Sequence, residues 1–141
     1  MPLNLSIVTQ EHEAVNAEVD SVTAMTTTGE VTILPGHIPL MTKLADTEFI
    51  YRIKGVEYSF AVTGGFLNVE PGNKIVVLAD SAVRREEINE AKAEEARKRA
   101  EATMQQEKLS ATEMFIAEGD LRKAILQLKV ARRKKINTLS S

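Results

Sequence analysis

The composition of this chain changes abruptly near residues 82–85, and this change limits the folds that the chain can adopt. All seven glycines except Gly119, all four prolines and every aromatic residue except Phe115 precede this point. The remainder is rich in Ala, Glu, Lys, Arg and Gln, which are good helix formers. A chain of 141 residues can form one large domain or two small ones. We therefore predict two parts, residues 1–84 and residues 85–141.

The first part has the alternating hydrophobicity of β-strands. Leu3, Leu5 and Ile7 alternate with polar residues, which is a period of two. The same period recurs at Val15, Ala17 and Val19, and at Phe49, Tyr51 and Ile53. Lys54-Gly55 and Pro71-Gly72-Asn73 separate apolar runs and predict hairpin turns. Many short strands with regular turns and no intervening helix predict an antiparallel β-sandwich or barrel.

The second part has the periodicity of two helices, which we expect near residues 85–108 and 113–136. Small apolar residues recur every three or four positions in the first helix, at Ala93, Ala96, Ala100 and Met104. The second helix carries a longer apolar stripe, formed by Met114, Ala117, Leu121, Ala124, Ile125, Leu128 and Ala131. The short link between the helices predicts an antiparallel two-helix hairpin. The fold class is therefore α+β, a sandwich followed by a hairpin.

The predicted seam between the two helices is made mostly of alanine methyl groups. Each buried carbon contributes only about 0.8 kcal/mol, so the packing is close but the adhesion is weak. Gly119 lies inside the second helix and costs about 1 kcal/mol relative to alanine. Two outcomes follow from this pattern. The hairpin either opens or detaches while the sandwich stays folded, or it is a fixed helical appendage.

The sequence lacks the residue patterns of common catalytic and metal sites. There is no cysteine, which excludes disulfides, thiolate zinc sites and thiol nucleophiles. His12 and His37 each stand alone, without the paired spacing of a metal site. No phosphate-binding loop and no Gly-x-Ser-x-Gly motif occurs. We therefore expect no catalytic residue and no bound metal. In addition, no apolar run approaches the roughly 18 residues that span a bilayer.

A run of basic residues distinguishes the C-terminal region, although the whole chain carries a formal net charge of -2. Between Leu121 and Lys135 there is no acidic residue, but there are Arg122, Lys123, Lys129, Arg132, Arg133, Lys134 and Lys135. A helix dipole favours cations at the C-terminal turn. This effect explains the basic residues at 132–135 but not Arg122 and Lys123. The run predicts a surface that binds an acidic partner. Nucleic acid is one such partner, although no aromatic residues are interleaved for base stacking.

Three segments resemble the conserved motifs of one protein family. The segment Thr28–Leu40, with the sequence TGEVTILPGHIPL, resembles the hallmark loop of ATP synthase epsilon subunits. The segments Val62–Asp80 and Leu121–Val130 also resemble that family, in the same order and over nearly the whole chain. Thr32 stands where the family usually has glycine. The resemblance implies a non-catalytic rotor subunit of a proton- or sodium-translocating F-type ATP synthase, which couples the catalytic head to the membrane ring.

The resemblance also implies partners and contact residues. The sandwich is expected to bind the gamma subunit and the c-ring, with Glu30 and His37 at the ring contact. The hairpin is expected to inhibit ATP hydrolysis by reaching the alpha and beta subunits. The contacts with acidic segments of beta are assigned to Arg122, Lys123, Arg132 and Arg133. Such a chain meets the membrane only through its complex, at the cytoplasmic face of a bacterial plasma membrane or at the stromal face of a thylakoid.

Regulatory ATP is a further implication of the resemblance, because some bacterial members bind it through an Ile/Leu-Asp-x-x-Arg-Ala motif. Ile88 and Ala93 match this motif, whereas Asn89 replaces the acid and Lys92 replaces the arginine. Lysine lacks the planar fork of arginine, so we expect no cofactor. Bound ATP would involve Ile88, Ala93, Arg99 and Arg122. Two alternatives to a coupling and inhibitory subunit therefore stay open, an ATP-sensing module and a free nucleic-acid-binding module.

Overall fold

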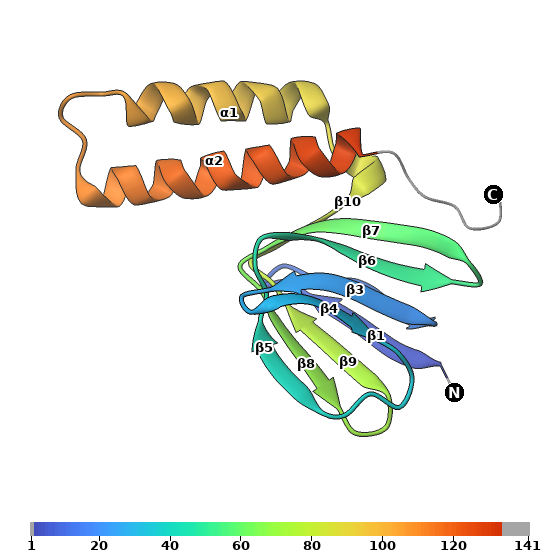
Figure 1. Cartoon of the computed structure of the whole chain (residues 1–141). Coiled ribbons are helices and arrows are strands. Elements are labelled where there is room, and N and C mark those ends of the chain that lie inside the picture. Colours follow the sequence, from blue (N-terminus) through green and yellow to red (C-terminus); the bar gives the residue numbers. More distant parts are fainter. Residues whose placement is uncertain (1, 134–141) are drawn as a thin grey trace.

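The computed structural model describes residues 2–133 and divides them into a β-sandwich and a helical hairpin (Figure 1). The strands of the sandwich are β1 (Leu3–Val8), β2 (Glu13–Val19), β3 (Ser21–Thr26), β4 (Gly29–Ile33), β5 (Leu40–Lys43), β6 (Thr47–Ile53), β7 (Val56–Thr63), β8 (Phe66–Glu70), β9 (Lys74–Leu78) and β10 (Ser81–Arg84). A 3-10 turn (Arg85–Glu87) leads to the helices α1 (Glu90–Met104) and α2 (Ala111–Arg132). The predicted fold class is confirmed.

The ten strands form two five-stranded sheets, in the orders β2-β1-β9-β8-β5 and β10-β7-β6-β3-β4. All pairs of strands within the described chain are antiparallel except β1 and β9, which run parallel with Leu5 opposite Ile75. Local turn signals specify antiparallel neighbours only, since two parallel strands need a long connection. The parallel pair was therefore not predicted from the sequence.

The space between the sheets holds the core of the sandwich. The side chains of Leu3, Leu5 and Ile7 lie on one face of β1 and point into this core. Phe49 of β6 adds a fully buried aromatic ring. This is the face that the period of two predicted for these strands. Tyr51 stacks on Tyr58 with ring centroids 5.4 Å apart, and burial raises the pKa of the Tyr51 phenol.

The two predicted hairpin turns are present. Lys54 and Gly55 connect β6 to β7 with φ angles of 51° and 79°, the left-handed pair that a two-residue hairpin loop requires. Gly72 and Asn73 have φ angles of 87° and 62° between β8 and β9. Glycine or asparagine occupies three of these four left-handed positions, where a bulkier residue is strained, and Lys54 is the exception.

Capping side chains set the helix starts, which differ from the predicted ones. The Asn89 side chain accepts a hydrogen bond from the Lys92 amide at 3.1 Å, so α1 begins at Glu90 and not at residue 85. Ser110 and Glu113 form a capping box that starts α2 at Ala111 instead of residue 113. The predicted end of the second helix, residue 136, lies outside the described residues.

The two helices pack through the predicted small residues, but α2 has a second buried face. Ala93 and Ala100 of α1 and Ala117 and Ala124 of α2 are buried. Ile125, which was predicted on this stripe, lines a hollow with Leu128 and with Glu94 and Arg97 of α1, and it is 47% exposed. Leu126 and Val130 are also buried, and they pack with Ala61 of β7 and with Ile88. Two residues correspond to about 200° of helix rotation, so Leu126 faces away from the Ala124 seam.

Candidate functional site

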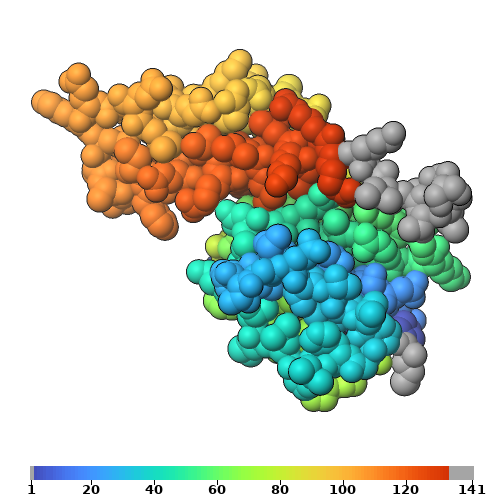
Figure 2. Space-filling model, viewed as in Figure 1, coloured from blue at the N-terminus to red at the C-terminus, as the bar shows by residue number. Residues whose placement is uncertain are grey.

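One stripe of α2 faces the sandwich and forms the junction between the two parts. It consists of Arg122, Leu126, Val130 and the C-cap residue Arg133, at spacings of four, four and three residues. Such spacings bring side chains to one side of a helix. The last turns of α2 lie over β7 and β10, while the other end of the hairpin extends beyond the sheet (Figures 1 and 2). The contacts of α2 with the sandwich thus come from its second half, between Arg122 and Arg133.

The centre of the junction is apolar. Val130 is fully buried and Leu126 nearly so, and both pack against Ala61 on the outer face of β7. Ile88 closes this cluster from the segment that precedes α1. Burying a valine or leucine side chain stabilises a contact by about 1.5–3 kcal/mol. This centre is small, so its contribution to the free energy of docking is only a few times that amount.

Arg133 forms an ion-pair cluster at one end of the junction. Its Nε donates to Glu48 Oε1 at 2.6 Å and its Nη2 donates to Glu48 Oε2 at 2.8 Å. The same Nη2 donates to Glu57 Oε2 at 2.5 Å. Hydrogen bonding to Glu48, followed by that to Glu57, raises the pKa of the Arg133 guanidinium. The two-pronged contact with Glu48 is the strong geometry for an arginine and a carboxylate.

Glu57 carries the most buried carboxylate of this cluster, since the residue is only 2% exposed. A second arginine, Arg52, lies on the same carboxylate, with Nη2 3.5 Å from Oε1. Arg85 donates a hydrogen bond to the carbonyl oxygen of Arg133, which ties the end of α2 to the segment after β10. Loss of Arg133 would leave a buried carboxylate with weaker compensation, which is costly.

Arg122 makes a second ionic contact at the other end of the junction. Its Nε lies 3.4 Å from Asp46 Oδ2, and Asp46 Oδ1 also accepts a hydrogen bond from the Gly64 amide at 3.4 Å. Arg122 and Arg133 are eleven positions apart in the sequence, which corresponds to about 16 Å along a helix. Two ionic contacts therefore flank the apolar centre.

The structure does not bring the four predicted inhibitory residues together on one exposed surface. Arg122 and Arg133 face the sandwich. Arg132 faces α1, where its Nε lies 3.4 Å from Glu90 Oε1 and its Nη2 lies 3.6 Å from Glu94 Oε2. Lys123 lines a groove between the two helices. The other predicted basic residues, Lys134 and Lys135, lie outside the described residues.

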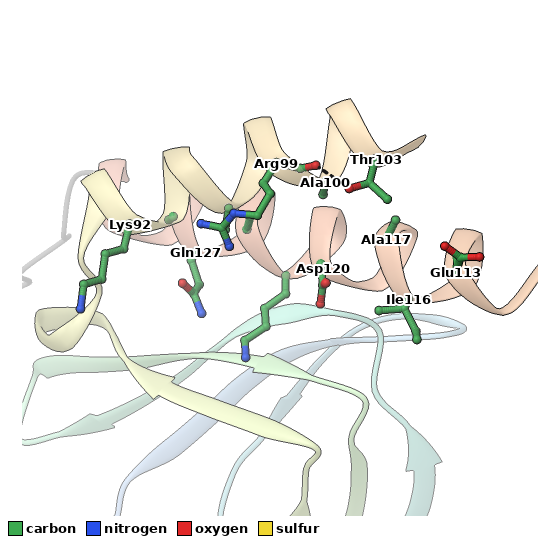
Figure 3. Close-up of a pocket in the computed structure, with 13 residues that line it drawn as sticks. Lys92, Arg99, Ala100, Thr103, Glu113, Ile116, Ala117, Asp120 and Gln127 are labelled. Atoms are coloured by element: carbon green, nitrogen blue, oxygen red, sulfur yellow. Dashed lines mark hydrogen bonds between the residues drawn. The ribbon is translucent and has the colours of Figure 1, made fainter. Parts of the chain in front are cut away.

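That groove runs along the hairpin and has a volume of about 600 Å³. Figure 3 shows Lys92 and Arg99 entering it from α1, and Asp120 and Gln127 from α2. Of the four residues predicted to contact ATP, Ala93 and Arg99 line the groove. Ile88 packs beneath the hairpin and Arg122 pairs with the sandwich instead. The predicted nucleotide contacts are therefore not assembled in this arrangement.

Glu30 and His37 lie at opposite ends of β4. Glu30 is exposed next to the turn that precedes the strand, and His37 follows the strand in the loop of residues 34–39. About 13 Å of extended chain separates Glu30 from the start of that loop. The loop turns at Pro35-Gly36, and the Gly36 amide donates to Asn73 Oδ1 at 2.8 Å. Its most exposed apolar side chain is Ile38, at 75%.

An exposed apolar patch on the outer face of the first sheet was missed by the sequence analysis. Phe66 and Leu78 lie opposite each other on β8 and β9, and Met41 on neighbouring β5 is 75% exposed. Contiguous exposed apolar patches mark interaction surfaces when they are large. Two pairs of adjacent apolar residues, Phe66-Leu67 and Val77-Leu78, could have predicted this patch. Adjacent residues of a strand point to opposite faces, so each pair places one apolar side chain outside the core.

Residues 2–133 contain neither a cluster of metal-ligating side chains nor a membrane-spanning helix. No group of three or more histidine, aspartate or glutamate side chains in this range is arranged to hold a metal ion. None of the helices that the structure describes is long and apolar enough to cross a membrane.

Comparisons with known proteins agree over both parts of the chain. The family described as ATP synthase, delta/epsilon chain, matches through its β-sandwich domain at residues 2–85 and through its long α-helix domain at residues 86–132. An ATP synthase epsilon chain of Dehalococcoides mccartyi is 47% identical over 133 residues, which is 94% of each chain. The epsilon chain of Chloroflexus aggregans is 43% identical over 142 residues and the full length of both.

Two solved structures share the fold. A chain in the mitochondrial ATP synthase of Euglena gracilis superimposes with a TM-score of 0.78 at 23% identity, covering 94% of this chain and 82% of that one. A chain in the central stalk and c-ring of the Tetrahymena thermophila enzyme gives a TM-score of 0.63 at 16% identity, covering 93% and 97%.

Proposed function

The chain belongs to the ATP synthase delta/epsilon family, and on that premise we propose that it is a non-catalytic rotor subunit of an F-type ATP synthase. It couples the catalytic head to the membrane ring, and its hairpin restrains ATP hydrolysis. Residues 1–84 provide the binding part and residues 85–141 the regulatory part. The coupled ion is a proton or sodium.

The observation that carries the inhibitory role is the limited junction between hairpin and sandwich. A few apolar side chains and two ionic contacts hold α2, and a two-state switch needs a gap of only a few kcal/mol. In this arrangement Arg122 pairs with Asp46, and Arg133 pairs with Glu48 and Glu57. Release of the hairpin would free both arginines for acidic segments of beta.

The binding roles follow from the exposed surfaces of the sandwich. The apolar patch of Met41, Phe66 and Leu78 suits a firm contact with gamma, because burying it excludes water from a contiguous surface. The loop of residues 34–39 with His37, together with Glu30, contacts the c-ring. The two ends of β4 would then touch different points of the ring. The bacterial relatives support a location at the cytoplasmic face of a plasma membrane, through the complex alone.

The two alternatives find less support. For an ATP-sensing module, Ile88 and Arg122 lie away from the groove, and Asn89 is engaged in capping α1. For a nucleic-acid-binding module, the arginines of α2 are paired with carboxylates of the same chain. Neither arrangement favours these functions over a coupling subunit.

The test is ATP hydrolysis by the cognate complex of alpha, beta and gamma, with the full chain or with a chain that ends at residue 85. The shorter chain retains the large core between the sheets and is expected to fold. We expect both chains to bind the complex and only the full chain to inhibit. Equal binding without inhibition by either chain would leave a coupling subunit with a fixed hairpin. Failure of both chains to bind would contradict the proposed function itself.

A further inference from the structure

Two loops meet at the end of the sandwich that lies away from the hairpin (Figure 1). One is the loop of residues 34–39 between β4 and β5, and the other is the turn of residues 71–73 between β8 and β9. The Gly36 amide donates to Asn73 Oδ1 at 2.8 Å, across 37 positions of the sequence. A backbone N–H can only donate, so the oxygen of the Asn73 side chain is the atom that faces it. A side chain of the turn therefore holds the backbone of the loop.

Both partners of this hydrogen bond have a fixed backbone. Residues 34–37 form a β-turn, in which the His37 amide donates to the Leu34 carbonyl oxygen at 3.1 Å. Gly36 takes the third position with a φ angle of 84°, as a type II turn requires. Asn73 is also left-handed, with a φ angle of 62°, and its carbonyl oxygen accepts from the Asn4 amide at 2.8 Å. The start of β1 thus anchors the residue that holds the loop.

The same loop fixes the imidazole ring of His37. Its Nδ1 lies 2.6 Å from the carbonyl oxygen of Ile38. A carbonyl oxygen can only accept, so Nδ1 carries the proton and the neutral ring keeps a lone pair on Nε2. Among residues 2–133, His37 Nε2 has no hydrogen-bond partner. Leu34 and Ile38 of this loop are both largely exposed. The loop therefore presents a hydrogen-bond acceptor together with two apolar side chains.

We propose that Asn73 is the positioning residue of the contact with the c-ring, and that it holds residues 34–38 in a preformed surface whose partner group donates a hydrogen bond to His37 Nε2. This inference rests on the proposed function and deepens it, because it names the chemistry that the ring offers to this loop. The partner is a polar loop with a donor, such as an amide or a cationic side chain, and with apolar atoms beside it. An ionised carboxylate cannot serve the neutral ring of His37, since both groups only accept.

Positioning by Asn73 acts on affinity more than on folding. A loop that is ordered before binding loses less conformational entropy when its partner arrives. Without the Asn73 oxygen, the loop of residues 34–39 loses its tie to the turn. The sandwich does not need this tie, because β8 and β9 pair from Phe66 with Leu78 to Glu70 with Lys74. The affinity for the ring and the stability of the sandwich should therefore respond differently to the loss of this oxygen.

The experiment measures how tightly the cognate c-ring, in detergent, binds the complex of alpha, beta, gamma and the full chain. Asn73→Gly accepts the left-handed backbone and removes the side-chain oxygen, so the dissociation constant should rise about fivefold. Asn73→Asp keeps an acceptor oxygen and should bind like wild type. His37→Leu removes Nε2 and should raise the dissociation constant about tenfold. The matched control is His12→Leu, an exposed position between β1 and β2 where no change is expected.

Two further measurements separate positioning from a purely structural role. The unfolding temperature of Asn73→Gly should stay near that of wild type, while hydrogen exchange of the Gly36 amide accelerates. A fall in unfolding temperature without a change in ring affinity would make Asn73 a structural residue only. The ¹⁵N NMR spectrum in alkaline buffer, where a histidine ring is neutral, should show the His37 proton on Nδ1. A proton on Nε2 would overturn the assignment of the acceptor.

The binding results also distinguish this inference from the proposed function. Wild-type affinity of Asn73→Gly, or an equal loss in Asn73→Gly and Asn73→Asp, overturns the positioning role. Unchanged binding by His37→Leu contradicts the chemistry assigned to the partner. Each of these outcomes leaves the proposed ring contact standing, because the wild-type complex still binds. A wild-type complex that binds the ring no better than the complex without this chain contradicts the proposed ring contact, and this inference falls with it.

Discussion

The sandwich and the hairpin bury apolar side chains of very different size. The sandwich encloses large groups such as Leu3, Leu5 and Phe49 between two sheets. The hairpin closes its seam with the methyl groups of Ala93, Ala100, Ala117 and Ala124. Because the free energy of burial scales with apolar area, we expect the sandwich to be stable by itself and the hairpin to depend on its junction.

The two parts also differ in how their contacts are distributed along the chain. The sandwich joins distant segments, such as β1 and β9, so it is expected to unfold as one unit. The hairpin touches the sandwich along one stripe of α2, and its far end leaves Phe115 71% exposed. A part that is held at one end can leave while the other part stays folded.

The largest expected effect comes from the sandwich core. Phe49→Ala should reduce the free energy of unfolding by about 3–5 kcal/mol, because it leaves a cavity where a fully buried ring was. Thermal unfolding followed by circular dichroism should show the sandwich and the hairpin lost together at a lower temperature. Loss of the sandwich signal while the helical signal of the hairpin persists would contradict the idea that the sandwich is the stable part.

A smaller and more local effect is expected at the junction. Val130→Ala removes buried methyl groups from the contact with Ala61 and should weaken docking by about 2 kcal/mol. Hydrogen exchange measured by mass spectrometry should then accelerate in α2, about tenfold or more, while exchange in β1 and β9 stays slow. Equal acceleration in both parts would show that the hairpin and the sandwich form one cooperative unit.

The smallest effect is expected from a gain of helix propensity. Gly119→Ala should stabilise α2 by about 0.5–1 kcal/mol, because the added methyl carbon would meet only Arg122 Nη2, at 3.9 Å. Slower exchange of the α2 amides would show it. The contrasting variant is Gly64→Ala in the sandwich, where φ is +62° and the new carbon would lie 2.1 Å from Asp80 Oδ2. Gly64→Ala should destabilise the sandwich. An equal gain in stability from both substitutions would contradict the difference that we expect between the two glycines.

Local signals in the sequence predicted the elements well where one segment determines its own structure. The alternation at Leu3, Leu5 and Ile7 and the turn at Lys54-Gly55 each need only neighbouring residues. The caps at Asn89 and Ser110 were also readable, since both residue types favour the N-cap position. Overlooking them misplaced both helix starts.

The candidate site was harder to predict, because its residues come from separate segments. The charges of Arg122 and Arg133 indicated an acidic partner, but not that Asp46, Glu48 and Glu57 of the same chain are their present partners. The apolar stripe on α2 was assigned to one face. The residues that hold the junction, Leu126 and Val130, occupy another.

By itself, the sequence determined the division of the chain, the strand and helix character of its parts, and the weak alanine seam, since propensity and periodicity act over a few residues. Only the tertiary structure decided that β1 runs parallel to β9 and that α2 lies on β7. It also decided that Arg133 reaches Glu57, 76 residues away. Contacts between distant segments depend on how complete surfaces fit together, and the sheets and helices must form before those surfaces exist.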